Sequence, residues 1–144
     1  MASHSSERDI ENLIGTYAFL VDDGDFDGLG ALLDQCDFAL GNGPAIRGKD
    51  AIAKFGHESL QVYEDGTPHT RHVTTNIIIE VDEAAGVAQS RSYYTVFQAV
   101  PGFPLQPIAC GRYRDRFART DGRWHFAERS VQTLLTGDLT HHRR

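Results

Sequence analysis

Two histidines, an aspartate and a tyrosine are the residues of this chain best suited to acid–base chemistry. His69 and His72 stand in the stretch "PHTRHVTTNIII", and the upstream stretch "YAFLVDDGDFDGL" carries Tyr17 and Asp22. A neutral imidazole accepts a proton readily near physiological pH. A carboxylate bonded to its other ring nitrogen fixes the tautomer and stabilises the imidazolium that forms. A tyrosine hydroxyl can donate a hydrogen bond to an oxygen that gains negative charge.

These groups suit proton transfer: dehydration, isomerisation or intramolecular cyclisation. No serine or cysteine stands in a setting typical of a nucleophile. Each residue alone also has an ordinary structural interpretation. Aspartates such as Asp22 are common near helix ends, a histidine such as His72 is often only hydrogen-bonded, and Tyr17 falls on an apolar helix stripe. His69 and His72 are three residues apart, which in a strand sends them to opposite faces, so we expect no shared metal.

Composition excludes several classes of partner. Fourteen Lys and Arg against twenty Asp and Glu give a net charge of −6, which argues against nucleic acid and anionic membrane surfaces. No apolar run approaches the roughly 20 residues of a membrane span. The N-terminus has no apolar signal region, and Cys36 and Cys110 lack CxxC spacing. We therefore expect a cytoplasmic protein with reduced thiols, folded as one domain over residues 1–144 with its core at about 8–139.

The first third of the chain has helical periodicity. Apolar residues recur at spacings of three and four from Ile10 to Val21, and Gly24 suits the end of that helix. Ser5 or Ser6 can cap its start. Shorter helices are expected over 25–33 and 49–63, with a strand, a turn and a short strand between them.

From His69 onward the period changes to two, which indicates β-strands. Helices followed by an antiparallel meander predict an α+β fold. Strands this long must twist, and a curled sheet with three N-terminal helices across its open side encloses a pocket. The expected strands are His69–Val81, Gly86–Ala99, Pro107–Arg119 and Arg123–Leu135.

Neither face of the first long strand is typical of a solvent-exposed surface. One parity carries Val73, Thr75, Ile77, Ile79 and Val81, and the other carries His72, Thr74, Asn76 and Ile78. We expect the apolar parity to be covered by packing or by a partner subunit, with His72 facing a partly polar cavity. In the alternative arrangement, the apolar parity faces the helices and His72 faces water.

Three stretches together resemble the SnoaL-like branch of the nuclear-transport-factor-2-like superfamily. They are "IENLIGTYAFLVDDGDFDGLGALL", "RHVTTNIIIEVD" and "GRYRDRFARTDGRWHFAERSV". The resemblance implies a cone-shaped α+β fold with a deep pocket, no metal or other cofactor, and a homodimer. Its enzymes include scytalone dehydratase, bile acid dehydratase and hexachlorocyclohexane dehydrochlorinase.

The resemblance also implies roles for particular residues. An Asp at the end of the first helix and a His at the start of the first long strand match Asp22 and His72, and a first-helix Tyr matches Tyr17. A pocket Arg on the last strand has Gln132 or its neighbours at the corresponding place. A second pocket His on the next strand corresponds to "SYYTVF", where Tyr93 or Tyr94 can replace it or the role is absent.

The sequence therefore predicts a small-molecule lyase or isomerase that acts on a hydrophobic, oxygenated, cyclic substrate. His72 is expected to act as the base, Asp22 as its orienting partner and Tyr17 as a hydrogen-bond donor. The alternative is a non-catalytic binding or accessory subunit of the same fold, such as the small subunit of a ring-hydroxylating dioxygenase. A disordered tail is expected at the terminal "HHRR". The expected substrate contacts are Tyr94, Phe55, Phe97, Tyr113 and Gln132.

Overall fold

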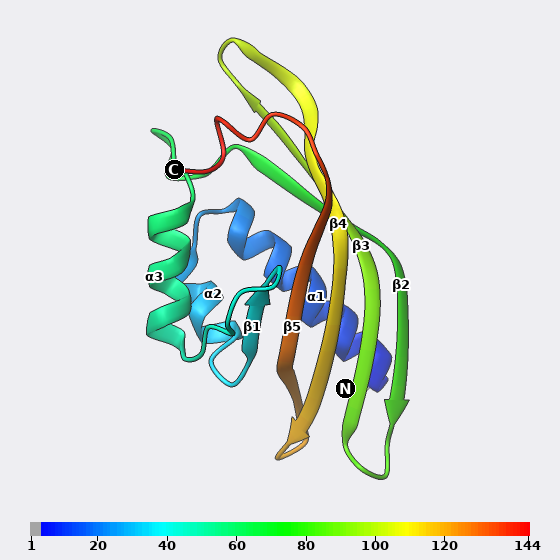
Figure 1. The fold of residues 1–144 in the computed structure, drawn as a ribbon. Helices are drawn as coiled ribbons and strands as arrows, with labels where there is room; N and C mark the ends of the chain where they lie inside the picture. The colour runs from blue at the N-terminus through cyan, green and yellow to red at the C-terminus, as the bar shows by residue number, and fades with distance from the viewer. Residues whose placement is uncertain (1–3) are drawn as a thin grey trace.

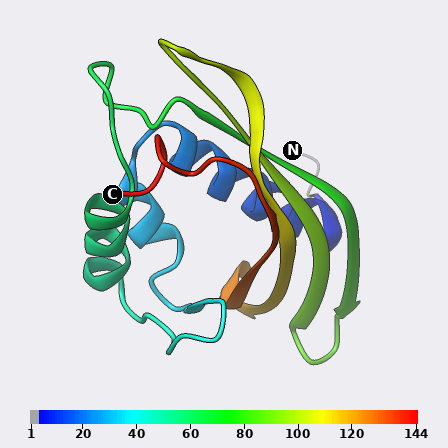
Figure 2. The same ribbon diagram turned by 45° about the horizontal axis from the view of Figure 1, so that its top comes forward.

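The computed structural model describes residues 4–144. Its elements, in chain order, are α1 (Ser6–Asp22), α2 (Phe26–Leu32), β1 (Asp37–Leu40), α3 (Lys49–Ser59), β2 (Thr70–Asp82), β3 (Val87–Val100), β4 (Phe103–Thr120) and β5 (Arg123–Thr136). The strands form one sheet in the order β1-β5-β4-β3-β2, in which β1 is parallel to β5 and the remaining pairs are antiparallel. The sheet is curled but unclosed, and the helices lie on its concave side (Figures 1 and 2). The predicted α+β class is confirmed.

Helix α1 carries the first half of the candidate site. The Ser5 hydroxyl caps it by accepting a hydrogen bond from the backbone N–H of Arg8 at 3.2 Å. Its buried stripe packs against β2 and β5 and ends on Asp22, the last helical residue. The helix closes at Gly24, which has a φ of 72°.

The close approach of two glycines fixes the distance between α1 and the start of β2. A Cβ atom on Gly24 would lie 2.1 Å from the carbonyl oxygen of Gly66. Only a residue without a side chain fits there, so the loop before β2 can rest directly on the end of α1. The first residues of β2 consequently lie beside Asp22.

A β-bulge changes which side chains of β2 face the helices. Its pairing with β3 is interrupted between Thr75 and Ile78, and Asn76 has a φ of 55°. The predicted division of this strand into two uninterrupted parities is therefore wrong beyond Asn76. The side chains on the more buried side are Thr70, His72, Thr74, Ile77, Ile79 and Val81.

Two element boundaries differ from the sequence-based prediction by more than one residue, and one predicted strand is nearly absent. Helix α3 ends at Ser59, because the chain becomes extended at Leu60. Strand β4 begins at Phe103, since the proline-containing stretch continues the pairing with β3. The second short strand expected before α3 is reduced to a single bridge between Phe38 and Ile46.

The expected disordered C-terminal tail is also wrong. The backbone of Arg143 forms a β-bridge with Leu60, and the backbone N–H of Gln61 donates to the carbonyl of His142 at 2.8 Å. In Figure 2 this segment runs from the end of β5 across the open side of the sheet to the end of α3. Backbone pairing, which the polar composition does not reveal, fixes its position. Within residues 4–144, no helix has the length and apolar character needed to cross a membrane.

Candidate active site

Asp22 and His72 are directly hydrogen-bonded, and the carboxylate is held at both oxygens. His72 Nδ1 lies 2.6 Å from Asp22 Oδ1, which also accepts a hydrogen bond from the Thr70 hydroxyl at 2.8 Å. Asp22 Oδ2 accepts from the backbone N–H of His72 at 2.7 Å. The side chains of Asp22 and His72 are each only 9% exposed. His69 instead contacts Asp65, so the two histidines do not share a site.

This geometry assigns a different task to each nitrogen of the His72 ring. An acceptor-only carboxylate at Nδ1 favours the tautomer that carries its proton there, which leaves a lone pair on Nε2. The ring lines a cavity on the concave side of the sheet. The imidazole is therefore arranged to accept a proton from a molecule in that cavity.

The cavity has a volume of about 860 Å³ and a wall rich in aromatic and aliphatic side chains. Tyr17 and four of the five predicted substrate contacts line it: Tyr94, Phe55, Tyr113 and Gln132. Phe97 lies outside that lining because it alternates along β3 with Tyr94 and Val96, which face the cavity. The volume and lining of the cavity fit a small, largely apolar ligand.

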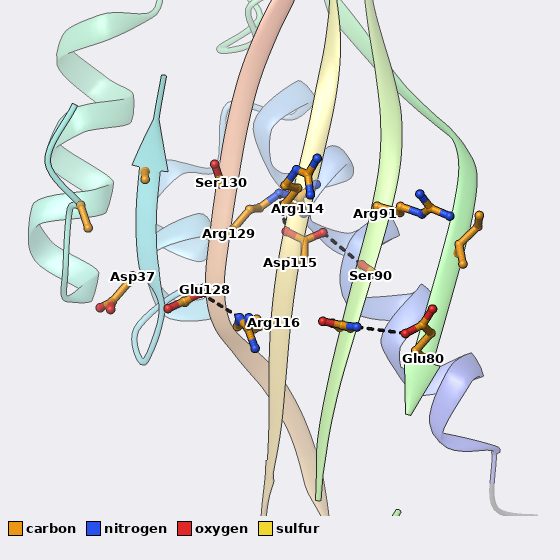
Figure 3. A pocket seen from close by; sticks show the side chains of 14 residues that line it. Asp37, Glu80, Ser90, Arg91, Arg114, Asp115, Arg116, Glu128, Arg129 and Ser130 are labelled. Atoms are coloured by element: carbon orange, nitrogen blue, oxygen red, sulfur yellow. Dashed lines mark hydrogen bonds and ion pairs between the residues drawn. The ribbon is translucent and has the colours of Figure 1, made fainter. Parts of the chain in front are cut away.

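A second hollow, of about 740 Å³, lies on the opposite side of the sheet (Figure 3). Arginines and acids from neighbouring strands line it, including Arg116, which pairs with Glu128 at 3.3 Å. Among residues 4–144, no histidine lines this hollow. The concave cavity, which contains the aspartate–histidine pair, is therefore the candidate active site.

Tyr17 presents an unused hydroxyl to the cavity. Burial raises its pKa to about 12, so the hydroxyl keeps its proton at neutral pH. It makes no hydrogen bond with any residue that the structure describes. The hydroxyl is therefore available to donate to a ligand oxygen.

A buried arginine that the sequence did not indicate packs against the ring of Tyr17. The side chain of Arg129, on β5, has no exposed surface, and its guanidinium lies 4.0 Å from the ring centre of Tyr17 and 3.6 Å from that of Tyr113. Its Nε is 3.5 Å from Asp115 Oδ1. Burial raises the pKa of the Asp115 carboxyl, whereas Arg129 lowers it. The resemblance placed a pocket residue of the last strand at Gln132 or its neighbours, and the guanidinium that lies against Tyr17 is that of Arg129, three residues earlier on β5.

Of the two tyrosines considered in place of a second histidine, only Tyr94 reaches the cavity. Its hydroxyl is 2.7 Å from the Thr133 hydroxyl, and its ring stacks on Tyr113 at 4.6 Å. Tyr93 points away and is 47% exposed. A second imidazole does line the cavity, but it is His142 of the C-terminal segment, which no sequence pattern indicated.

Comparison with known proteins identifies the family. The model of the SnoaL-like domain matches residues 2–130. The chain belongs to the SnoaL-like family. The recognition made from the three sequence stretches is thus confirmed. A search of curated protein sequences finds no match.

Solved structures show the same fold. A protein of unknown function from Mycobacterium tuberculosis (Rv3472) is 26% identical with a TM-score of 0.71, over 88% of this chain and 70% of that one. An NTF2-like protein with a cystatin-like fold from Novosphingobium aromaticivorans is 23% identical with a TM-score of 0.73, over 89% and 81%. A putative scytalone dehydratase from the same organism is 24% identical with a TM-score of 0.70, over 92% and 86%.

Proposed function

We propose that this SnoaL-like protein is a small-molecule lyase or isomerase that acts on a hydrophobic, oxygenated, cyclic substrate. The observation that carries the proposal is the bonded Asp22–His72 pair, whose imidazole lines a mostly apolar cavity. Family membership and the likeness to a putative scytalone dehydratase support the same general kind of activity.

In the proposed reaction, His72 Nε2 takes a proton from a carbon next to a carbonyl group. Asp22 stabilises the resulting imidazolium through Nδ1, and Tyr17 donates a hydrogen bond to a substrate oxygen that gains charge. In an isomerisation, the imidazolium returns the proton to a different carbon. In a dehydration, the C–O bond at the neighbouring carbon breaks, a C=C bond forms, and the departing oxygen leaves as water with the proton from His72. The isomerisation moves only protons, the dehydration also expels water, and neither needs a redox cofactor.

The alternative is a binding or accessory subunit that keeps the cavity but performs no proton transfer. A carboxylate pointing to solvent, or a cavity without the imidazole, would have favoured it. Here the carboxylate accepts three hydrogen bonds from Thr70 and His72. The imidazole of this bonded pair lines the cavity, and a bonded pair that opens onto a cavity favours the enzyme.

Deuterium exchange into 2-tetralone, a bicyclic ketone with an acidic C–H beside its carbonyl, tests the proposal. The native protein in D₂O should accelerate exchange at that carbon above the buffer rate. The His72→Gln variant should lose the acceleration and retain its affinity for the ketone. His69→Gln is the matched control, because His69 lies outside the cavity lining and should leave exchange unchanged. Accelerated exchange that survives in His72→Gln would mean that another residue is the base. A native protein that does not accelerate exchange would leave the ligand-binding alternative.

We also propose a cytoplasmic homodimer that forms through the outer face of the sheet. Val73, Ile78 and Tyr93 expose apolar surface there, with exposed fractions of 42%, 47% and 47%. A second copy of the chain would cover these side chains. Sedimentation analysis of the native protein and of a Tyr93→Glu variant tests this: the variant should dissociate, and a monomeric native protein would contradict the proposal.

A further inference from the structure

The C-terminal segment 137–144 forms part of the cavity wall. Residues Leu139, His142, Arg143 and Arg144 all line the cavity that contains His72. The segment is held from two directions. The Gln61 side-chain amide donates to the carbonyls of Thr140 at 2.7 Å and Arg143 at 2.5 Å, and the buried Gln98 amide donates to the carbonyl of His141 at 3.0 Å.

These bonds fix the position of His142 opposite His72. The two ring centres are 6.4 Å apart, and their planes meet at 55°. A hydrogen bond spans about 3 Å between heavy atoms, so a small group bonded to one imidazole lies within reach of the other. A C–H next to a carbonyl group is such a unit, because only the carbonyl carbon separates the carbon that carries the proton from the carbonyl oxygen.

The surroundings of His142 leave one of its nitrogens free for a ligand. The residue is only 8% exposed, and Nδ1 is buried with no hydrogen-bond partner among residues 4–144. Because the ring lines the cavity, Nε2 is the nitrogen that a ligand can reach. An unpartnered buried N–H is costly, so the tautomer with its proton on Nε2 is favoured.

The charge state of His142 agrees with a hydrogen-bonding role. Burial, His72 and Arg143 together lower its pKa to about 4, while Asp22 raises it slightly. Two further charged residues, Glu58 and Arg144, line the same cavity. At neutral pH the ring is uncharged, so it can donate one hydrogen bond without adding a second cation beside His72.

We propose that His142 is a second substrate-contacting residue, whose Nε2–H donates a hydrogen bond to the carbonyl oxygen next to the C–H that His72 attacks. This inference rests on the proposed function and narrows its substrate class to cyclic ketones or related carbonyl compounds. The C-terminal segment is then a component of the active site, because the cavity without it lacks one of its two imidazoles.

Binding of two matched probes tests this role. 2-Tetralone and tetralin share a carbon skeleton, but only the ketone has an oxygen. Dissociation constants are measured in the His72→Gln background, where the proposed base is absent, so the result does not depend on turnover. His142→Phe should weaken binding of 2-tetralone by about tenfold, the equivalent of one lost hydrogen bond, and leave tetralin unchanged. His142→Gln, which keeps an N–H donor, should retain part of the preference for the ketone.

His141→Phe is the control, since His141 is the adjacent residue and does not line the cavity. Equal losses for both probes, no loss for either, or no binding of the ketone would overturn the role. Selective loss without any exchange in the native protein would support the contact and contradict the proposed reaction. Exchange in the native protein, together with an unchanged preference for the ketone in His142→Phe, would support the proposed reaction and contradict the contact with His142.

A measurement on the native protein avoids reliance on variants that fold poorly. With ¹⁵N-labelled histidine, the Nε2–H resonance of His142 should shift when 2-tetralone is added and should not shift with tetralin. An unchanged resonance at saturating ketone would overturn the assignment.

Discussion

Replacing Asp22 with asparagine tests the pairing with the smallest change in shape. The carboxylate accepts three hydrogen bonds, from the Thr70 hydroxyl, the backbone N–H of His72 and His72 Nδ1, at 2.8, 2.7 and 2.6 Å. An amide of the same size offers one acceptor oxygen and an NH₂ group. At least one of these three donors would therefore meet another donor.

The imidazole can relieve that conflict by changing its tautomer. With the NH₂ group of the substituted side chain opposite Nδ1, the ring proton moves to Nε2, and the nitrogen facing the cavity loses its lone pair. In a serine protease the same Asp-to-Asn change lowers kcat by about 10⁴-fold through the wrong tautomer. We expect a decrease of about 10³- to 10⁴-fold in the His72-dependent rate. Charge-assisted hydrogen bonds contribute about 1.5–3 kcal/mol each, so the variant should also be less stable by about 2 kcal/mol.

The assay is deuterium exchange into 2-tetralone, followed by NMR, together with urea unfolding of the same samples. Asp23→Asn is the control because Asp23 is adjacent and exposed, and because this substitution removes the same charge. Exchange by Asp22→Asn at the native rate, in a variant shown to be folded, would refute the reasoning. It would mean that the carboxylate plays no part in orienting His72.

Tyr17→Phe keeps the ring between Phe38 and Tyr113 but removes the hydroxyl. Deuterium exchange should slow by about 10²-fold with little change in the urea midpoint. An unchanged exchange rate would exclude the Tyr17 hydroxyl as a hydrogen-bond donor. Gly24→Ala would place a Cβ 2.1 Å from the Gly66 carbonyl oxygen at a φ of 72°, so the free energy of unfolding should fall by at least about 1–2 kcal/mol; an unchanged midpoint would contradict the close approach. The pKa of His142 is lowered from 6.5 to about 4, so on acidification the unfolded chain binds a proton at this residue at a higher pH than the folded protein does. The free energy of unfolding should therefore fall by up to about 3 kcal/mol as the pH drops from 6.5 to 4. His142→Phe should lack that part of the acid sensitivity, and an equally steep loss in the variant would contradict it.

The sequence predicted the elements well because their patterns are local. The stripe of α1 and the alternation of the strands each depend on neighbours within a few residues. The Asp22–His72 contact is different, since the two residues are 50 positions apart in the chain. Their pairing was expected only through the family resemblance, and it depends physically on the contact between Gly24 and Gly66.

One missed feature leaves no trace in the local pattern, and two others depend on long-range packing. The bulge at Asn76 lies beside three consecutive isoleucines, where no alternation exists to reveal a change of face. Arg129 is a charged residue in a strand, and its burial between Tyr17 and Tyr113 requires a helix that lies more than a hundred residues earlier. His142 lies in a polar stretch whose position is fixed by hydrogen bonds from distant parts of the chain.

The ¹⁵N spectrum of the His72 ring at pH 8 tests the central claim most directly. The account predicts that Nδ1 carries the proton, that Nε2 is bare, and that 2-tetralone shifts the Nε2 resonance more than the Nδ1 resonance. In Asp22→Asn the two nitrogens should exchange roles. A proton on Nε2 in the native protein, or a ring unaffected by the ketone at saturation, would contradict the claim that Asp22 prepares His72 to accept a proton inside this cavity.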